Sequence, residues 1–584
     1  MVNLARWAAE ATDYVPADVA PDAGTATHLN RKVQGLERGG VVTHPLAAAF
    51  ARRAGRYVLI DVSGYAGIAR PRALVRHSHC LPADGRRGDD MRPSPLLIAA
   101  VTIGLGAGTT AQQRAEQRNM SLVGYHDLQG RSAYQPTIQR QGNRWIAYIG
   151  HHGGGAPNPL TGTNERNGTS IVEVTDPRKP RYVAHIPGEQ GQGEAGGAQM
   201  ARVCTGRDLP RANRDEVYLL RSFGNSAHEV WNVTDPGRPT LLTVVVNGLT
   251  NTHKNWWECD TGIAYLVGGD PAWRTRRMTK IYDLSNPAKP VFVRDFGLPG
   301  QQPGATGPIP TELHGPISIG PKGNRVYFGY GTSRAGVVQI VDRERLLNGP
   351  KEPTDANLLY PQVARLDLPP DAGAHTAFPL LGLQLGEFAR QKLPTSAPSP
   401  GAGHHHGDEV PLATTQSHRD FLAVVSESVA NECEEPRQML RTIDITYEST
   451  PVGAATWTVA EASGNFCGRG GRFGAHSSHE SFTPIYYGRI LFVAFFNAGV
   501  RALDVRDPFR PTEIAHFIPA VTAKTDKRCV GAGASERCKV AIQTNNVEVD
   551  GRGYVYIVDR ANTGMHILDL TGEARKLARF DAAR

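Results

Sequence analysis

The chain has 584 residues, of which 40% are hydrophobic and 21% are charged, and its formal charge is +8. Residues 1–111 hold 13 Lys and Arg against nine Asp and Glu, so the rest of the chain has 51 basic and 47 acidic side chains. This near balance excludes the basic footprint of a nucleic-acid-binding protein. After residue 111 no apolar run is long enough to span a bilayer, so no integral membrane segment is expected there.

The segment MRPSPLLIAAVTIGLGAGTTAQQ, which begins at Met91, has the pattern of a secretion signal. Arg92 gives a positive start, residues 95–108 are apolar apart from one threonine, and small residues follow them. We therefore expect a signal peptide at 91–111, cleavage after Ala111, and a periplasmic or secreted protein. The alternative is a buried strand or helix of an N-terminal domain.

Residues 1–90 contain scattered Arg, Ala and Gly and show little helical or strand periodicity. We interpret them as a disordered extension that arises from an overextended start, with Met91 as the true initiator. The mature chain would then be 112–584.

The mature chain contains six cysteines once Cys80 is set aside with the extension. Six cysteines allow fifteen pairings, and an oxidising compartment favours disulfides over thiolate metal ligands. The spacing favours three pairs: Cys204 with Cys259, Cys433 with Cys467, and Cys529 with Cys538.

One short unit occurs seven times, as in SIVEVTDP, EVWNVTDP and RALDVRDP. Its acidic or Asn position falls at Glu173, Asn232, Asp283, Asp342, Asp444, Asp504 and Asp569. The successive gaps are 59, 51, 59, 102, 60 and 65 residues, so one gap departs from the period. That gap contains a Pro-, Ser-, Gly- and His-rich tract, which we interpret as an inserted disordered loop at about 383–417.

Short apolar runs precede each unit, and a Pro-rich turn with another β-rich run follows most of them. Each unit therefore supplies four strands, and seven such units predict an all-β fold, a seven-bladed β-propeller of four-stranded antiparallel blades over 112–584. A solenoid is the alternative. Closure is favoured because SLVGYHDL, near the start, resembles the last strand of a unit and could complete the final blade.

The IVEVTDPRKP type of repeat resembles the LVIVD-repeat family of exported bacterial β-propellers, over nearly all of 121–584. The resemblance implies the fold and says little about function. QIVDRERL and RTIDITYE lack the Asp-Pro turn.

The first strand of each blade lines the central channel, so the residues that open each unit are candidate site residues. They are Gln135, Gln199, His253, His314, His375, His479 and Asn546, with His476 as the competing residue of the sixth unit. Three of the histidines are 61 residues apart, which is the blade period. Imidazoles from separate blades could share one transition metal, with iron or copper favoured and zinc possible.

Other residues near the channel extend this hypothesis. Glu312, Glu480 and Glu548 could orient ligating imidazoles through their second ring nitrogen. Trp256 and Trp257 could form an aromatic wall, and His126 and Arg131 could bind a substrate anion or pin the closing strand. His151 and His152 are expected in a turn at the channel mouth. The alternative is a wet channel in which the histidines bind only water and backbone.

The favoured function is a metal-dependent oxidoreductase that acts on a small organic substrate. Carotenoid cleavage oxygenases and selenium-binding methanethiol oxidases, which are similar only in architecture, also hold metals on histidines near a propeller axis. A non-catalytic propeller that binds a protein or glycan is the alternative, and a metal-dependent lactonase ranks below both because it usually requires carboxylate ligands.

Overall fold

The computed structural model describes residues 48–53, 56–61, 114–385 and 418–583. The chain divides into two units, Met1–Gly104 and Leu105–Arg584. In the first unit, the described residues form the antiparallel pair β1 (Ala48–Arg53) and β2 (Arg56–Asp61). The predicted signal peptide, its cleavage site, Cys80 and almost all of the predicted loop at 383–417 lie outside the described residues.

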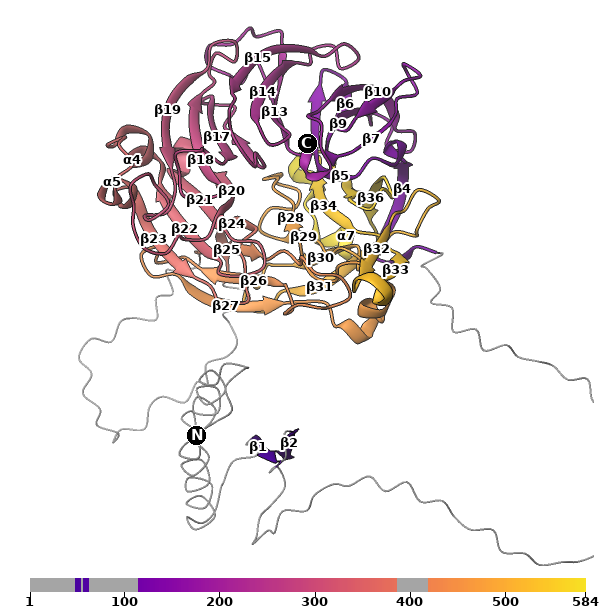
Figure 1. The fold of residues 1–584 in the computed structure, drawn as a ribbon. Coiled ribbons are helices and arrows are strands. Elements are labelled where there is room, and N and C mark those ends of the chain that lie inside the picture. Colours follow the sequence, from indigo (N-terminus) through magenta and orange to yellow (C-terminus); the bar gives the residue numbers. More distant parts are fainter. Residues whose placement is uncertain (1–47, 54–55, 62–113, 386–417, 584) are drawn as a thin grey trace, which may run out of the picture. The chain divides into compact units, whose positions relative to one another are not determined.

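The second unit is a seven-bladed β-propeller of antiparallel blades, as the repeats predict (Figure 1). From the inner to the outer strand, the first blade contains β5 (Ala133–Gln141), β6 (Arg144–Gly153), β9 (Gly168–Glu173) and β10 (Arg181–Pro187), and the second contains β12 (Ala201–Thr205), β13 (Val217–Phe223), β14 (Ala227–Asn232) and β15 (Thr240–Val246). The third blade contains β16 (Asn255–Trp257), β17 (Ile263–Gly268), β18 (Met278–Asp283) and β19 (Val291–Phe296), and the fourth contains β20 (Leu313–Ser318), β21 (Arg325–Tyr330), β22 (Val337–Asp342) and β23 (Gln362–Asp367).

The fifth blade contains β24 (Thr376–Gln384), β25 (His418–Val425), β26 (Leu440–Asp444) and β27 (Val452–Trp457). The sixth contains β28 (Ser477–Ser478), β29 (Ile490–Ala494), β30 (Val500–Asp504) and β31 (Thr512–Ile518). The seventh contains β34 (Thr544–Val549), β35 (Val555–Asp559), β36 (Met565–Leu570) and β4 (Met120–His126). Two blades have an added fifth strand: β11 (Gly193–Ala198) on β6, and β3 (Glu116–Arg118) on β31. The ring closes as predicted, because β4 from the start of this unit pairs with β36 from its end.

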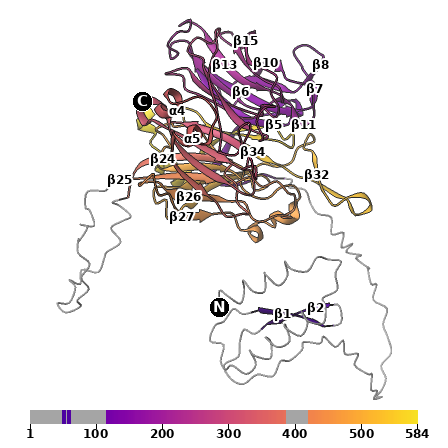
Figure 2. The same cartoon turned by 60° about the vertical axis from the view of Figure 1, so that its left-hand side comes forward.

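The remaining described elements of this unit lie in the connections between strands and after β36. They are two hairpins, β7 (Gly155–Pro157) with β8 (Asn164–Arg166) and β32 (Lys527–Val530) with β33 (Arg537–Val540), the helices α3 (Gly320–Gly323), α4 (Arg343–Asn348), α5 (Asp355–Leu359) and α7 (Gly572–Leu577), and the 3-10 turns η1 (Leu128–Gly130), η2 (Glu461–Ser463), η3 (Phe466–Arg469), η4 (Gly533–Ser535) and η5 (Phe580–Ala583). Figure 2 shows the β32 hairpin projecting from the propeller.

The recurring acidic or Asn position ends the third strand of the first six blades and is the residue before the last one of that strand, Asp569, in the seventh. In the third blade, Oδ1 of Asp283 accepts a hydrogen bond of 2.8 Å from the backbone N of Ser285, and Oδ1 of Asn286 accepts one from the backbone N of Ala288. Short polar side chains that bond to backbone two residues later favour turns. The same first contact recurs at Asn232, Asp444 and Asp504.

The hydrophobic core lies between the blades. The described residues form seven buried clusters, and each cluster lies mainly between two neighbouring blades, including the last blade and the first. Alternation along each second strand produces this pattern. On β6, Ala147 and Ile149 pack toward the last blade, whereas Ile146 and Tyr148 pack toward the second. Both faces of a blade are therefore apolar, and the polar residues of the inner strands are left to the channel.

The three disulfides are the pairs that the sequence favoured. Cys204 on β12 is bonded to Cys259, just after β16, and so links the second and third blades. Cys433 is bonded to Cys467 in η3, and Cys529 is bonded to Cys538 across the β32–β33 hairpin.

Candidate metal centre

Four histidines from four consecutive blades meet at the start of the inner strands: His253, His314, His375 and His476. The two Nε2 atoms of His253 and His314 are 3.1 Å apart. The ring centroids of His314 and His375 are 3.7 Å apart, and those of His375 and His476 are 4.3 Å apart. Each of the four residues is at most 2% exposed. We call these four residues the histidine cluster.

His479, the other candidate of the sixth blade, lies outside this cluster. Its Nδ1 accepts a hydrogen bond of 3.1 Å from the backbone N of Phe492, and its ring packs near Phe378. Counting twelve residues back from Leu491, where the sequence suggests that the second strand begins, leads to His479, as the same count from Val326 leads to His314. The count misleads because the connection from β28 to β29 is longer than that from β20 to β21. The backbone N of His476 donates to Ala494 O as that of His375 does to Val425 O, so these two positions are equivalent.

A buried carboxylate, Glu427, faces the histidine cluster. Its Oε2 lies 3.9 Å from Nε2 of His314 and 3.9 Å from Nε2 of His375, and its Oε1 lies 3.7 Å from Nε2 of His476. Nη1 of Arg472 donates to Oε1 at 2.9 Å, so Oε2 is the oxygen left for the other two histidines. The donor atoms of His314, His375 and Glu427 all lie within 4.8 Å of one another and could hold a metal ion.

A second carboxylate, Glu194, lies beside the first histidine of the cluster. Its Oε2 is 4.0 Å from Nδ1 of His253, and its Oε1 is 3.3 Å from Nε2 of His152. Arg560 donates to Glu194 at 2.8 Å and lies 3.6 Å from Oε1 of Glu427. Tyr134 completes this side, since its hydroxyl is 3.0 Å from Nε2 of His253.

Burial sets the charge of the histidine cluster. It lowers the pKa of all four imidazoles well below the usual value, because a charged ring loses hydration there, and neighbouring cations lower it further. All four rings are therefore neutral at neutral pH and retain a lone pair for a metal. Burial raises the pKa of Glu427 despite Arg472 and Arg560. The Glu194 side chain is 42% exposed, so it loses only part of its hydration, and His152 and then Arg560 lower its pKa.

Hydrogen bonds to the second ring nitrogen orient two of the imidazoles. Nδ1 of His476 donates to the backbone O of Asn545, and Nδ1 of His375 is 3.1 Å from the hydroxyl of Thr376. Because a carbonyl only accepts, the proton of His476 is on Nδ1 and its lone pair is on Nε2. The Nε2 atoms of His375 and His476 are buried and have no hydrogen-bond partner among the described residues.

The three glutamates expected behind the imidazoles lie elsewhere. Glu312 is paired with Arg276 at 3.3 Å. Glu480 forms ion pairs with Lys254, at 3.0 Å, and with Arg202. Glu548 accepts a hydrogen bond of 3.2 Å from the backbone N of Glu480. The carboxylates beside the histidine cluster are Glu427 and Glu194 instead.

The remaining predicted residues divide between the channel and the core. Gln135 and Asn546 are buried on inner strands and are hydrogen-bonded to each other, and Gln199 bonds to the backbone O of Glu194. Trp256 is half-buried, with the Arg202 guanidinium 4.5 Å from its ring centroid.

Trp257, Arg131 and His126 have structural contacts. Trp257 packs in the core between the second and third blades. Arg131 is 1% exposed and donates to Asn167 and to the backbone O of Ala156, so it pins the loops around β7 and β8. His126 stacks on Tyr182.

The pH dependence of stability offers a test of the Glu548 environment. Burial raises the pKa of Glu548 to about 7, so the folded state binds this proton more tightly than the unfolded state, whose value is 4.5. Stability therefore falls as the pH rises from about 4.5 through 7. The Glu548→Gln variant should lack this pH dependence. Its free energy of unfolding, relative to that of the wild type, should therefore be about 2–3 kcal/mol higher at pH 8 than at pH 5. Urea unfolding of both proteins at pH 5 and pH 8 measures this change. The same difference in free energy of unfolding at both pH values would contradict the prediction.

The sequence did not predict Glu427, Glu194 and Tyr134 at the site, and the expectation of a turn at His151 and His152 is wrong, because both are buried in strand β6. A usable signal existed for Glu427, which follows the second strand β25 by two residues. In an antiparallel blade the end of the second strand lies beside the start of the first. Residues just after second strands are therefore neighbours of the aligned histidines. Glu194 gave no such signal, because β11 is an added strand outside the four-strand unit.

No family model matches the chain, and no curated protein matches it. Among solved structures, the chain is similar to Sqt1 from Chaetomium thermophilum, with 10% identity and a TM-score of 0.41 over 77% of this chain and 99% of that one. No functional inference follows from a similarity of this extent. Within the described residues, no helix has both the length and the apolar character needed to cross a membrane.

Proposed function

We propose that the protein is an exported, metal-dependent oxidoreductase that acts on a small organic substrate at the mouth of the propeller channel. His314, His375, His476 and Glu427 would hold the metal, with His253 next to them. One observation carries the proposal: the Nε2 atoms of His375 and His476 are buried, find no hydrogen-bond partner in the described part of the chain, and lie within 4 Å of the Glu427 carboxylate. Buried polar atoms need a partner, and a cation bound by all of them would supply it.

The spacing of the donor atoms supports a single ion. Two donors about 2.1 Å from a tetrahedral ion lie roughly 3.4 Å apart. The separations in the cluster are 3.1–3.9 Å, so small side-chain movements would bring the donors to that distance. His314, His375 and Glu427 are the two imidazoles and one carboxylate of a non-haem Fe(II) donor set, to which His476 would add a third imidazole, so iron is favoured, with copper and zinc as alternatives.

The residues of the chain would prepare this site in three ways. Arg472 holds Oε1 of Glu427 and leaves Oε2 for the metal. The backbone O of Asn545 fixes the tautomer of His476. The Tyr134 hydroxyl beside His253 offers a proton donor at the edge of the cluster. A bound metal would supply redox or Lewis-acid chemistry to a substrate that enters from the channel mouth.

Metal analysis of the purified protein tests this proposal. We expect about one equivalent of iron, copper or zinc after anaerobic reconstitution, and an anomalous-scattering peak between His375 and Glu427. Less than a tenth of an equivalent of each metal would overturn the proposal, and the alternative, a non-catalytic propeller that binds a protein or glycan, would take its place.

Export is the second part of the proposal, and three disulfides support it because such bonds persist in oxidising compartments. We expect the mature protein to begin at Gln112, because small residues precede this position. N-terminal sequencing of the extracytoplasmic fraction measures it, and replacing Ala111 with Glu should block cleavage. A peptide from residues 1–90 in the exported protein would contradict it.

A further inference from the structure

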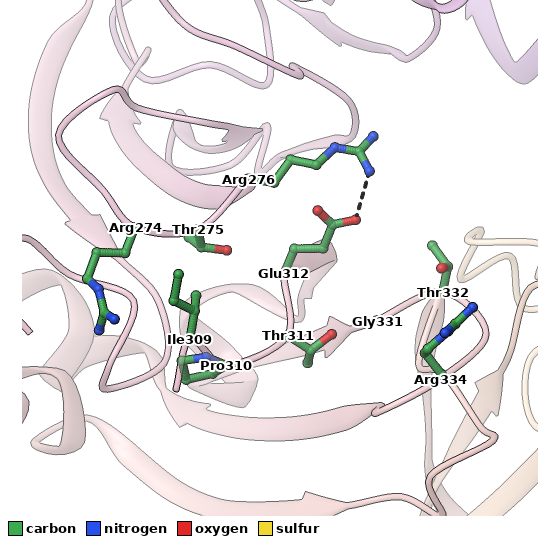
Figure 3. A pocket seen from close by; sticks show the side chains of 10 residues that line it. All are labelled: Arg274, Thr275, Arg276, Ile309, Pro310, Thr311, Glu312, Gly331, Thr332 and Arg334. Atoms are coloured by element: carbon green, nitrogen blue, oxygen red, sulfur yellow. Dashed lines mark hydrogen bonds and ion pairs between the residues drawn. The ribbon is translucent and has the colours of Figure 1, made fainter. Parts of the chain in front are cut away.

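A pocket of about 310 Å³ opens among loops of the third and fourth blades. Three loops line it: the β17–β18 loop, the segment before β20, and the β21–β22 loop. The lining residues are Arg274, Thr275, Arg276, Ile309, Pro310, Thr311, Glu312, Gly331, Thr332 and Arg334 (Figure 3). Its volume is at the lower end of the range for small-molecule sites.

The backbone of the pocket is joined to three residues of the candidate metal centre. The carbonyl O of Thr332 accepts a hydrogen bond of 2.8 Å from the backbone N of Glu427. The carbonyl O of Gly331 accepts one of 3.0 Å from Ala374, the residue before His375. In the third loop, the segment before β20, Glu312 precedes His314 by two residues. A molecule in this pocket would therefore lie next to the histidine cluster.

The pocket contains three guanidinium groups and one carboxylate. Arg276 is paired with Glu312, and Arg274 donates to the backbone O atoms of Gly300 and Gly307. The exposed side chain of Arg334 has no hydrogen-bond or ion-pair partner among the described residues. Figure 3 shows Arg334 and Thr332 across the open space from the Arg276–Glu312 pair. The net positive charge and a free guanidinium fork favour an anion, and a carboxylate in particular.

One wall of the pocket is apolar. Ile309 is 52% exposed there and is followed by Pro310. A partner with both a charged end and a hydrocarbon end fits this arrangement, because the hydrocarbon would cover Ile309 while the charge meets Arg334.

We propose that this pocket binds the carboxylate group of a small organic acid, with Arg334 as the main charged contact and Ile309 against the hydrocarbon. The inference rests on the proposed function in that it names the substrate class of that site: an organic acid held by its carboxylate in a pocket whose loops are hydrogen-bonded to the metal centre. Arg334 is then a specificity-determining residue.

The test is calorimetric titration of metal-free protein, which removes binding of the acid to the metal. The probes are hexanoate, its neutral analogue hexanamide, and inorganic phosphate. We expect hexanoate to bind with a Kd below 5 mM and at least tenfold more tightly than hexanamide. Arg334→Gln should weaken hexanoate binding at least tenfold, and Glu312→Gln should strengthen it about threefold or more, because the competing carboxylate is removed.

Arg238→Gln is the matched control, since Arg238 is an exposed arginine in the turn after β14, far along the chain from the pocket loops. It should change the Kd less than twofold. No hexanoate binding, equal binding of hexanamide, binding of phosphate alone, or equal loss in Arg334→Gln and Arg238→Gln would each overturn the inference. The metal centre is tested separately by the metal content of the protein. A failure of the carboxylate pocket is therefore distinguishable from a failure of the metal centre.

Discussion

Replacing His476 with Gln should weaken metal binding more than 100-fold, whereas the same replacement of His479 should leave metal stoichiometry and affinity unchanged. Loss of a residue that hydrogen-bonds to a metal ligand lowers metal affinity about 10- to 100-fold, and loss of the ligand itself should lower it further. His476 presents an unpartnered Nε2 to Glu427, while Nδ1 of His479 accepts a hydrogen bond from Phe492, outside the cluster. Competition with a chelator of known affinity measures the difference.

The two variants are a matched pair, because both histidines are about 1% exposed and lie on the same blade. Far-ultraviolet circular dichroism and thermal unfolding of both variants separate loss of the metal from loss of the fold. A larger loss of metal affinity in His479→Gln, or no loss in either variant, would contradict the assignment of His476. His375→Ala should reproduce the effect of His476→Gln, since His375 offers Nε2 to the same carboxylate.

Removing strand β4 should destabilise the propeller by more than about 4 kcal/mol, because the ring would open at its closing blade. Met120 of this strand is 1% exposed in the core between the sixth and seventh blades, and the strand covers the edge of β36. An uncovered edge also promotes aggregation. Guanidinium unfolding of a chain that begins at Asp127 measures the effect against a chain that begins at Arg114.

A third chain, which begins at Asn119, is the control. It lacks only β3, whose ion pairs Arg118–Glu513 and Glu116–Arg469 are at the surface, so its stability should lie within about 1 kcal/mol of that of the longest chain. If the shortest chain does not fold, Met120→Ala supplies the same test at an expected loss of about 2–4 kcal/mol. Equal stability of all three chains would show that closure through β4 is unimportant.

Much of the fold could be read from local chemistry. The Pro-rich segments predicted a turn after most units, and in the structure Asp283 stabilises one of these turns by accepting a hydrogen bond from the backbone N two residues later. The resemblance of SLVGYHDL to a last strand predicted closure, and β4 fills that position. The 61-residue spacing of His253, His314 and His375 predicted their convergence, because equal steps around a ring bring equivalent positions to one axis.

The sequence by itself determined the number of blades, the closing strand, the disulfide pairs and three of the four clustered histidines, because each follows from a repeat or from near neighbours in the chain. Only the tertiary structure decided between His476 and His479, added Glu427 and Glu194 to the site, and formed the pocket around Arg334. The physical reason is that loop lengths vary from blade to blade. A count along the chain loses its register across an irregular loop, whereas hydrogen bonds between strands preserve the register in space.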